Sequence, residues 1–267
     1  MTEPRTPRVA LVTGAARGIG AATVLALAQA GWLVLATDSA SDDPALPYPM
    51  ARPADLSRLA AKAGVPGQVH TFVADVRDPA AVEAAVTEAE SRWGGLDAAI
   101  AAAGVIAGGV PLWQVPAGQQ QAVLDVNLGG VLNLARAAIP ALLRRPAPRS
   151  GRFLAVASAA ATRGLPMLAA YCAAKAGVAG LIRALAAELA DSGVTANAVS
   201  PGSTATPILD ESARLYGLPT AGTFAGQQPM GRLLDPAEVA AVLAFLAGPG
   251  SSGMTGAIVP VDGGLAL

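Results

Sequence analysis

The residues best suited to proton transfer in this sequence are a tyrosine and a lysine one helical turn apart, Tyr171 and Lys175. On a helix, residues i and i+4 lie above one another with Cβ atoms about 5–6 Å apart. A phenol has an ordinary pKa of about 10, and a neighbouring ammonium group favours the phenolate and lowers that pKa. We therefore expect Tyr171 to exchange protons and Lys175 to lower its pKa. An isolated pair of this kind is usually an ordinary feature of a helix surface, so a catalytic role depends on the other motifs in the sequence.

A serine lies 13 residues before Tyr171 and closes an apolar run. The run covers residues 152–157 and is typical of a buried parallel strand, with Ser158 directly after it. Open α/β sheets keep their sites at the carboxyl ends of the strands. Ser158 is therefore expected to hold a substrate oxygen while Tyr171 exchanges its proton.

A glycine-rich turn near the N-terminus joins an apolar strand to a helical segment. Its glycines are Gly14, Gly18 and Gly20. Glycines let a backbone approach a pyrophosphate closely, and a helix N-terminus offers free N–H groups and a favourable dipole. The next apolar strand ends in Asp38, 18 residues after Gly20, close to the roughly 20 residues at which dinucleotide-binding folds place a ribose-binding acid. The sequence therefore predicts a dinucleotide site.

Apolar runs and helical segments alternate along the chain. The predicted strands are residues 8–13, 32–37, 69–74, 97–102, 152–157, 194–199 and 257–261. Alternation of this kind implies right-handed crossovers and a parallel sheet. We expect one α/β domain over residues 1–267, a Rossmann-type doubly wound parallel sheet of about seven strands with helices on both faces.

These motifs together resemble the short-chain dehydrogenase/reductase superfamily over essentially the whole chain. The resemblance rests on the TGxxxGIG pattern from Thr13 to Gly20, on Ser158, and on the YxxxK pattern of Tyr171 and Lys175. Further matching residues are Asp75 with Val76, Asn127, Pro201 with Gly202 and Thr206, and the terminal run Val261-Asp262-Gly263-Gly264.

The resemblance implies roles for individual residues. Tyr171 would be the acid/base, Lys175 would lower its pKa and bind the nicotinamide ribose, and Ser158 would orient the substrate oxygen. Asn127 would hold a water that relays protons through Lys175. The cofactor-binding residues that it implies are Thr13, Gly14, Arg17, Gly18, Ile19, Gly20, Asp38, Asp75, Val76, Ala102, Ala103, Gly104, Tyr171, Lys175, Pro201, Gly202, Thr204 and Thr206.

The sequence departs from the family pattern after the fourth predicted strand. It has Ala101-Ala102-Ala103-Gly104 where the family commonly has Asn-Asn-Ala-Gly. The change removes side-chain amides that can brace the sheet, but it keeps the small residues and the backbone that border the adenine ribose.

The choice between NAD and NADP depends on two charges. Asp38 is expected to accept hydrogen bonds from ribose hydroxyls and to repel a 2′-phosphate, and residues 39–41 contain no cation. Arg17 argues in the opposite direction, because an arginine in the glycine-rich turn can reach a 2′-phosphate. We expect NAD to be preferred, because a fixed carboxylate outweighs one mobile cation.

Two segments are longer than the fold requires, residues 39–53 and 203–234. The first has four prolines, which favour an ordered flap near the adenosine half of the cofactor; a mobile surface insertion is the alternative. The second is interpreted as a substrate lid of one or two short helices. The proline-rich segment and the run from Ala101 to Gly109 resemble the mycofactocin-coupled branch of the superfamily. That resemblance implies a retained NAD whose electrons pass to mycofactocin.

Composition narrows the class of protein. A formal net charge of −1 and an isoelectric point near 5.8 give no reason to expect nucleic acid or an anionic membrane as partner. The chain has a single cysteine, which fits a reducing cytosol, and no run of about 18 uninterrupted apolar residues. The first seven residues contain an acid and prolines where a signal peptide would need an apolar core. A cytoplasmic location is expected, with no membrane span and no metal.

The predicted function is hydride transfer between a secondary alcohol or ketone and a nicotinamide cofactor. Apolar lid residues such as Leu209, Tyr216 and Phe224 suggest a hydrophobic, alicyclic or terpenoid-like substrate. Low surface charge and the family resemblance imply a homotetramer. Two alternatives remain, an NADPH-dependent 3-ketoacyl-thioester reductase and a non-catalytic dinucleotide sensor.

Overall fold

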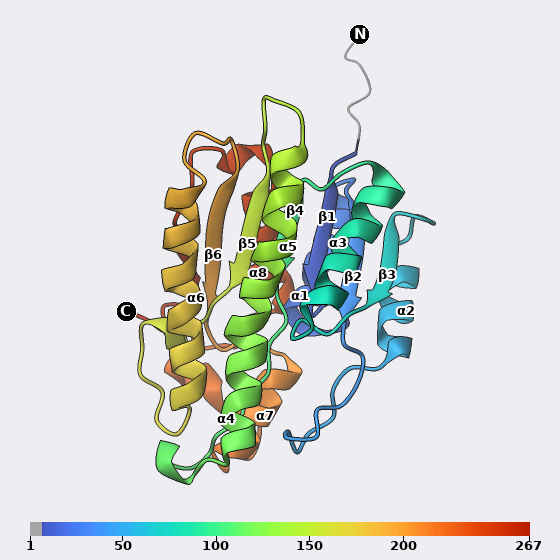
Figure 1. Cartoon of the computed structure of the whole chain (residues 1–267). Coiled ribbons are helices and arrows are strands. Elements are labelled where there is room, and N and C mark those ends of the chain that lie inside the picture. Colours follow the sequence, from blue (N-terminus) through green and yellow to red (C-terminus); the bar gives the residue numbers. More distant parts are fainter. Residues whose placement is uncertain (1–6) are drawn as a thin grey trace.

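A seven-stranded parallel sheet forms the middle layer of the protein in the computed structural model, which describes residues 7–267 (Figure 1). The strand order is β3-β2-β1-β4-β5-β6-β7, which confirms the predicted doubly wound sheet. The expectation about a signal peptide concerns mainly residues 1–6, which lie outside the described residues. The strands are β1 (Val9–Thr13), β2 (Leu33–Asp38), β3 (Val69–Val73), β4 (Ala98–Ala101), β5 (Arg152–Val156), β6 (Thr195–Pro201) and β7 (Ile258–Val261).

Helices cover both faces of the sheet (Figure 1). The α-helices are α1 (Gly18–Gln29), α2 (Pro53–Lys62), α3 (Pro79–Trp93), α4 (Ala117–Leu124), α5 (Gly130–Arg144), α6 (Ala169–Glu188), α7 (Pro207–Leu215) and α8 (Pro236–Ala247). The short helical turns are η1 (Leu112–Gln114), η2 (Asp125–Gly129), η3 (Ala159–Ala161), η4 (Ala221–Gln227) and η5 (Pro249–Ser251). Helices α3, α5 and α6 supply the apolar layer on one face, and α1, α2 and α8 supply the layer on the other.

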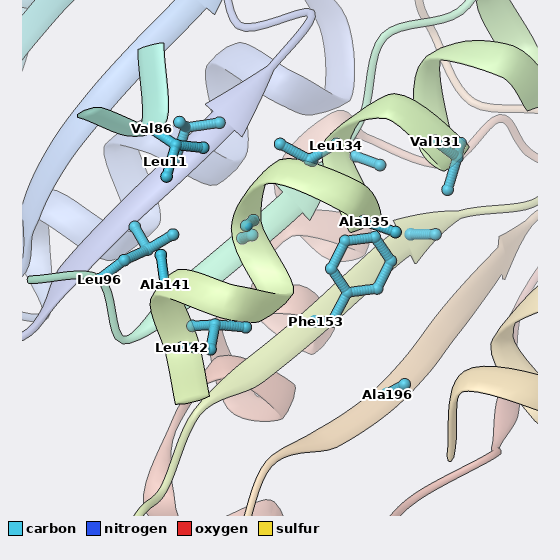
Figure 2. Packing of buried hydrophobic residues seen from close by; sticks show 14 of the residues in the cluster. Leu11, Val86, Leu96, Val131, Leu134, Ala135, Ala141, Leu142, Phe153 and Ala196 are labelled. Carbon is cyan, nitrogen blue, oxygen red and sulfur yellow. The ribbon is translucent and has the colours of Figure 1, made fainter. Parts of the chain in front are cut away.

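Alternate residues of each strand enter different apolar layers, because side chains alternate across a sheet. Leu11 of β1 and Phe153 of β5 pack with Leu134 and Leu142 of α5, and all four are fully buried (Figure 2). Their neighbour Leu154 faces the layer of α1 and α8. Burial on both faces explains the continuous apolar runs of these strands and fixes the positions of their carboxyl ends.

Several helices begin and end at residues that suit those positions. Asp78 caps α3 by accepting a hydrogen bond from the Ala80 N–H, and Gly94 ends that helix with a left-handed φ of 79°. Thr206 caps α7 by accepting a hydrogen bond from the Leu209 N–H. The cap at Thr206 is relevant to the site, because it holds the start of α7 beside the glycine-rich turn.

The strand order reverses between β1 and β4, and in such sheets this switch point opens a crevice at the carboxyl ends of the strands. A cavity of about 640 Å³ lies at that edge, lined by residues that follow β1, β2, β4, β5 and β6. The fold therefore brings together the segments in which the sequence motifs lie.

Within residues 7–267, two helical stretches are long and apolar enough, by length and composition, to cross a membrane. They are the continuous stretch Ala117–Arg144 and helix α6. Both contribute residues to the core against the sheet, and core helices of globular proteins pass the same test.

Candidate functional site

The residues predicted from the sequence gather around one cavity at the carboxyl edge of the sheet. All the predicted cofactor-binding residues except Thr13 line it, and so do Ser158, Tyr171 and Lys175. Two predicted site residues, Thr13 and Asn127, do not line the cavity; both are buried beside it. The cavity is continuous from the glycine-rich turn to helix α7.

The glycine-rich turn is packed too closely for side chains. A Cβ atom on Gly14 would overlap the backbone of Ala103, and one on Gly20 would overlap the carbonyl of Gly14. Gly14 also has a left-handed φ of 63°. The first N–H groups of α1 receive no side-chain cap, so they are available to an anion at the cavity. This cradle fits the pyrophosphate of a dinucleotide.

Thr13 braces the turn from behind. Its hydroxyl oxygen accepts hydrogen bonds from the N–H groups of Ala102 and Ala103, at 3.2 and 3.4 Å. The expected loss of bracing at the alanine run is therefore partly offset, because the backbone of that run is held by a threonine of β1.

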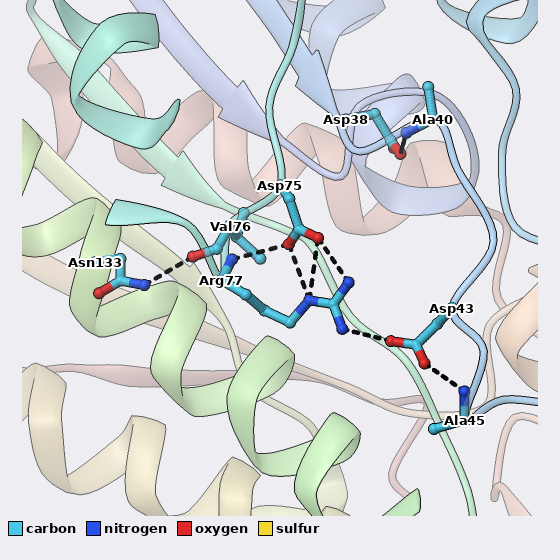
Figure 3. A network of polar contacts seen from close by, with 8 residues as sticks. All are labelled: Asp38, Ala40, Asp43, Ala45, Asp75, Val76, Arg77 and Asn133. Carbon is cyan, nitrogen blue, oxygen red and sulfur yellow. Dashed lines mark hydrogen bonds and ion pairs between the residues drawn. The ribbon is translucent and has the colours of Figure 1, made fainter. Parts of the chain in front are cut away.

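Asp38 is fixed at the end of β2. One carboxylate oxygen accepts a hydrogen bond from the Ala16 N–H, and the other accepts one from the Ala40 N–H, both at 3.1 Å (Figure 3 shows the second). Ala40 adopts a left-handed φ of 51° to direct its N–H back to Asp38. The carboxylate is thus held by the glycine-rich turn on one side and by the 39–53 segment on the other.

Asp75 belongs to a charged network that links β3 to the 39–53 segment (Figure 3). The Arg77 guanidinium donates to Asp75 at 2.6 Å and to Asp43 at 2.5 Å. Burial acts to raise the pKa of Asp75, but hydrogen bonds from the side chain and backbone of Arg77 outweigh it and hold the pKa below its usual value. Asp43 is 7% exposed, so the network anchors a buried carboxylate of the segment.

The 39–53 segment extends from β2 to α2 (Figure 1) and contacts the chain that follows β4. The Tyr48 hydroxyl accepts a hydrogen bond from the Ile106 N–H at 2.9 Å. Leu46 and Tyr48 pack in an apolar cluster that also contains Val123 of α4 and, at its edge, Tyr171. Burial raises the pKa of Tyr48 to about 12. The segment therefore reaches from Asp38 at one end of the cavity to the apolar cluster beside Tyr171.

The three predicted catalytic groups converge from two elements. Tyr171 and Lys175 lie one turn apart on α6, and Ser158 follows β5 as the cap of η3, accepting a hydrogen bond from the Ala160 N–H at 3.1 Å. The Lys175 ammonium lies 5.7 Å from the centroid of the Tyr171 ring and donates to the Val156 carbonyl at 2.8 Å. The spacing of YxxxK therefore places both side chains on one side of α6, as predicted.

Burial dominates the acid–base properties of this pair. It raises the pKa of Tyr171, and the hydrogen bond with Ser158 acts in the opposite direction. Burial also lowers the pKa of Lys175 to about 8. Desolvation of the phenolate therefore dominates the pKa of Tyr171 in this arrangement, and the expected lowering of that pKa by Lys175 stays a prediction.

Asn127 lies on a π-helical turn, η2, between α4 and α5. Its side chain is fully buried, donates to the Val105 carbonyl at 2.8 Å and accepts from the Val105 N–H at 2.9 Å. A Cβ atom on Gly104 would lie 3.2 Å from its carbonyl oxygen. Asn127 therefore braces the backbone that borders the cavity. Asn127 lies in a π turn within a long helix, and such turns are frequent at functional sites.

The end of the cavity beyond Ser158 is mainly apolar. The Tyr216 hydroxyl donates to the Pro166 carbonyl at 2.7 Å, and its ring meets Phe224 edge to face at a centroid distance of 6.1 Å. Four residues of this end, Ile208, Ser212, Leu218 and Gln227, lie within the predicted lid segment 203–234. The residues that the sequence analysis did not indicate are Arg163, Gly164, Leu165, Pro166, Leu168 and Leu265. They lie in loops, where no local pattern distinguishes them.

Metal-ligating side chains do not cluster within residues 7–267: no group of three or more His, Cys, Asp or Glu residues is placed to hold an ion. His70 instead lies 3.4 Å from Glu88. The Cys172 sulfur contacts the backbone of Leu165.

Comparisons with known proteins identify the family. A family profile described as enoyl-(acyl carrier protein) reductase matches residues 14–266. Cis-4-hydroxycyclohexanecarboxylate dehydrogenase of Sinomonas cyclohexanicum is 38% identical, with 99% of this chain and 98% of the relative covered. The 3-oxoacyl-[acyl-carrier-protein] reductase of Thermotoga maritima is 34% identical over 97% of this chain and 98% of its own length.

A solved structure extends the comparison to three dimensions. Carveol dehydrogenase from Mycobacterium avium, in complex with NAD, superposes with a TM-score of 0.90 at 31% identity, covering 97% of each chain. Together with the seven-stranded sheet and the gathered glycine, serine, tyrosine and lysine residues, these matches show that the chain belongs to the short-chain dehydrogenase/reductase superfamily.

Proposed function

We propose that this protein is an NAD-dependent oxidoreductase that transfers hydride between an apolar secondary alcohol or ketone and the nicotinamide. The observation that carries the proposal is that Ser158, Tyr171 and Lys175 share one cavity with the glycine-rich cradle and Asp38. The nicotinamide, when bound, supplies the hydride chemistry. The protein supplies the proton transfer and the alignment.

Each catalytic side chain has a distinct task in this proposal. In ketone reduction the Tyr171 phenol gives its proton to the ketone oxygen; in alcohol oxidation the Tyr171 phenolate takes the proton from the alcohol oxygen. Ser158 orients that oxygen with its hydroxyl. Lys175 holds the nicotinamide ribose and presents a positive charge toward the phenol. Lys175 is buried and Tyr171 is partly buried, so the charge of Lys175 acts on the phenol in surroundings of lower dielectric constant than bulk water.

The choice of NAD rests on the setting of Asp38. Its carboxylate lines the cavity and is held from both sides by backbone N–H groups. A carboxylate fixed in this way suits the hydroxyls of an adenine ribose and repels a 2′-phosphate. Binding of the remaining dinucleotide falls to the glycine-rich turn, Asp75 with Val76, and the small residues from Ala102 to Gly104.

We further propose that the 39–53 segment retains the cofactor, so that electrons leave through an external carrier such as mycofactocin. The support is the anchoring of the segment on both sides of the crevice, at Arg77 and at Ile106. Protein purified without added nucleotide should release close to one NAD per chain on denaturation. A variant lacking residues 44–50 should emerge largely empty, because affinity differences appear mostly in dissociation.

Turnover tests the main proposal. Substrates to try first are hydroxylated six-membered rings, because the names of two relatives denote such alcohols. The assay should supply NAD in one arm and an artificial electron acceptor in the other. Reduction of resident NAD by an alicyclic alcohol supports the proposal. Bound NAD without reduction over a broad panel of alcohols would instead indicate a dinucleotide sensor.

A second candidate activity is reduction of 3-ketoacyl thioesters, favoured by the likeness to the Thermotoga maritima reductase. That activity would need NADPH and a basic entrance for a phosphopantetheine arm. Faster NADPH oxidation with a 3-ketoacyl thioester than with any alicyclic ketone would favour it over the main proposal.

Two further features of the predicted enzyme remain proposals. We propose that α7 and η4 form a substrate lid, because both contribute apolar residues to the far end of the cavity. We also propose a cytoplasmic homotetramer, which light scattering can test through the molar mass in solution.

A further inference from the structure

Arg17 lies in the turn between β1 and α1, and the 39–53 segment holds its guanidinium. One terminal nitrogen donates to the Pro49 carbonyl at 3.0 Å, and the other lies 3.6 Å from the sulfur of Met50. Both acceptors belong to the segment. Met50 and Arg17 line the cavity together with Asp38, so this contact is made beside the expected position of the adenine ribose.

The other arginines around this end of the cavity are also engaged. Arg52 pairs with Asp42 at 2.6 Å, Arg58 pairs with Asp55, and Arg77 pairs with Asp43 and Asp75. Arg17 differs from these three because its partners are a backbone carbonyl and a thioether, which carry no negative charge. It is therefore the guanidinium that a competing phosphate would attract most readily.

The position of the two acceptors is set by contacts of the segment elsewhere. Tyr48, next to Pro49, is buried and bonded to the Ile106 N–H. The Met50 N–H donates to Asp42 at 3.0 Å. A shift of Arg17 toward a ribose 2′-position thus gives up two contacts, while the segment that made them is fastened to the opposite wall and stays in place.

We infer that the 39–53 segment is a cofactor-selectivity element: by engaging Arg17 it withholds the one cation that would offset the repulsion between Asp38 and a 2′-phosphate. The inference rests on the proposed use of NAD and adds the cause of the preference. Arg17 and Asp38 are then not independent determinants. The effect of Arg17 on NADP binding depends on whether the segment is in place.

A double-mutant cycle tests this dependence. Arg17→Ala is made in the natural protein and in two backgrounds that release Arg17. One background is Tyr48→Ala with Met50→Ala; the other replaces residues 44–50 with two glycines and retains Asp42 and Asp43, so that Arg52 and Arg77 keep their partners. Arg144→Ala removes the same charge from a distant surface and serves as the matched control. Each protein is equilibrated with mixed NAD and NADP until the bound fractions are constant, then denatured, and both nucleotides are counted.

In the natural protein, Arg17→Ala should change the bound NADP to NAD ratio by less than about twofold. The two backgrounds that release Arg17 should raise that ratio by about tenfold, which corresponds to the free energy of one charge-assisted hydrogen bond. Adding Arg17→Ala to either background should cancel the rise. An equal effect of Arg17→Ala in all backgrounds, or an unchanged ratio in both folded release variants, would overturn the inference. If the loop replacement does not fold, the point variants decide. A natural protein that binds NADP more tightly than NAD would refute the proposed cofactor choice. The role of the segment is decided separately, by whether the effect of Arg17→Ala differs between the natural and the release backgrounds.

Discussion

The two ends of the cavity obtain their chemistry by opposite means. At the proposed catalytic end, Lys175 is buried and Tyr171 is partly buried, and desolvation moves both pKa values toward the neutral forms. At the proposed adenosine end, Asp75 keeps a lowered pKa because Arg77 supplies hydrogen bonds that outweigh burial. Burial disfavours the charged forms at the first end, whereas at the second end Arg77 is paired with two carboxylates.

The difference between the two ends of the cavity predicts which substitutions should change the turnover rate and which should change cofactor binding. Removing a side chain from the proposed catalytic end should lower the turnover rate strongly, because the groups there take part in proton transfer. A change in the charge of the adenosine end should alter cofactor choice or the anchoring of the 39–53 segment, because those charges hold partners in place. The predictions follow from the largest expected effect to the smallest.

Tyr171→Phe should abolish turnover while the fold and cofactor binding persist. The change keeps ring packing and deletes only the hydroxyl, and a positioned acid/base contributes about 10²–10⁴-fold. Tyr216→Phe is the matched control at the far end of the cavity, where the hydroxyl is bonded to Pro166. Steady-state rates decide: a Tyr171→Phe protein that keeps more than roughly a tenth of the natural rate would remove Tyr171 from its role.

Asp38→Asn should shift the bound NADP to NAD ratio by at least about tenfold toward NADP. Charges about 4 Å apart repel by ~4 kcal/mol at an effective dielectric of 20, and only part of that is recovered while Arg17 stays engaged. Asp191→Asn, at an exposed left-handed position that suits asparagine, is the charge-matched control. The ratio is read from competitive binding; an unchanged ratio would mean that Asp38 does not face the ribose.

Lys175→Met should raise stability in a way that depends on pH. The folded pKa of Lys175 is about 8, below its unfolded value of 10.5, so its buried charge costs most below pH 8. That cost, on the order of 1–3 kcal/mol, should fade as the pH rises from 8 to 10.5. The lost hydrogen bond to Val156 offsets part of the gain at every pH.

Thermal melts of natural and Lys175→Met protein from pH 7 to 10.5 test this dependence. The gap between their midpoints should move in favour of the natural protein as the pH rises. The exposed Lys62→Met change should show no such trend. A gap independent of pH would contradict a lowered pKa for Lys175.

Asp43→Asn should destabilise the protein by about 1–2 kcal/mol, because it leaves one hydrogen-bonded donor of Arg77 without its charged acceptor at a partly exposed site. Glu90→Gln breaks the more exposed pair with Arg144 and should cost less than about 1 kcal/mol. Urea unfolding compares the two. Equal costs would place the Asp43 contact among ordinary surface pairs.

Local spacing accounts for what was predictable from the sequence. The inner strands such as β1, β4 and β5 were predictable because buried parallel strands are continuous apolar runs, whereas the edge strands β3 and β7 are only partly buried. Each predicted strand lies within two residues of the observed one. The pairing of Tyr171 with Lys175 follows from the helical period alone. The glycines were readable because a close backbone approach excludes every other residue at Gly14 and Gly20.

The tertiary structure decided what joins distant residues and what burial does to them. Arg77 reaches Asp43 across 34 residues, Arg17 reaches Pro49 across 32, and Tyr48 reaches Ile106 across 58. No helical or strand periodicity connects such positions, because the path of the 39–53 segment is set by packing against α4 and against the residues that follow β4. Burial likewise raises the pKa of Tyr171, and the sequence alone did not predict this contribution, because the cost of desolvating a phenolate depends on everything that surrounds it.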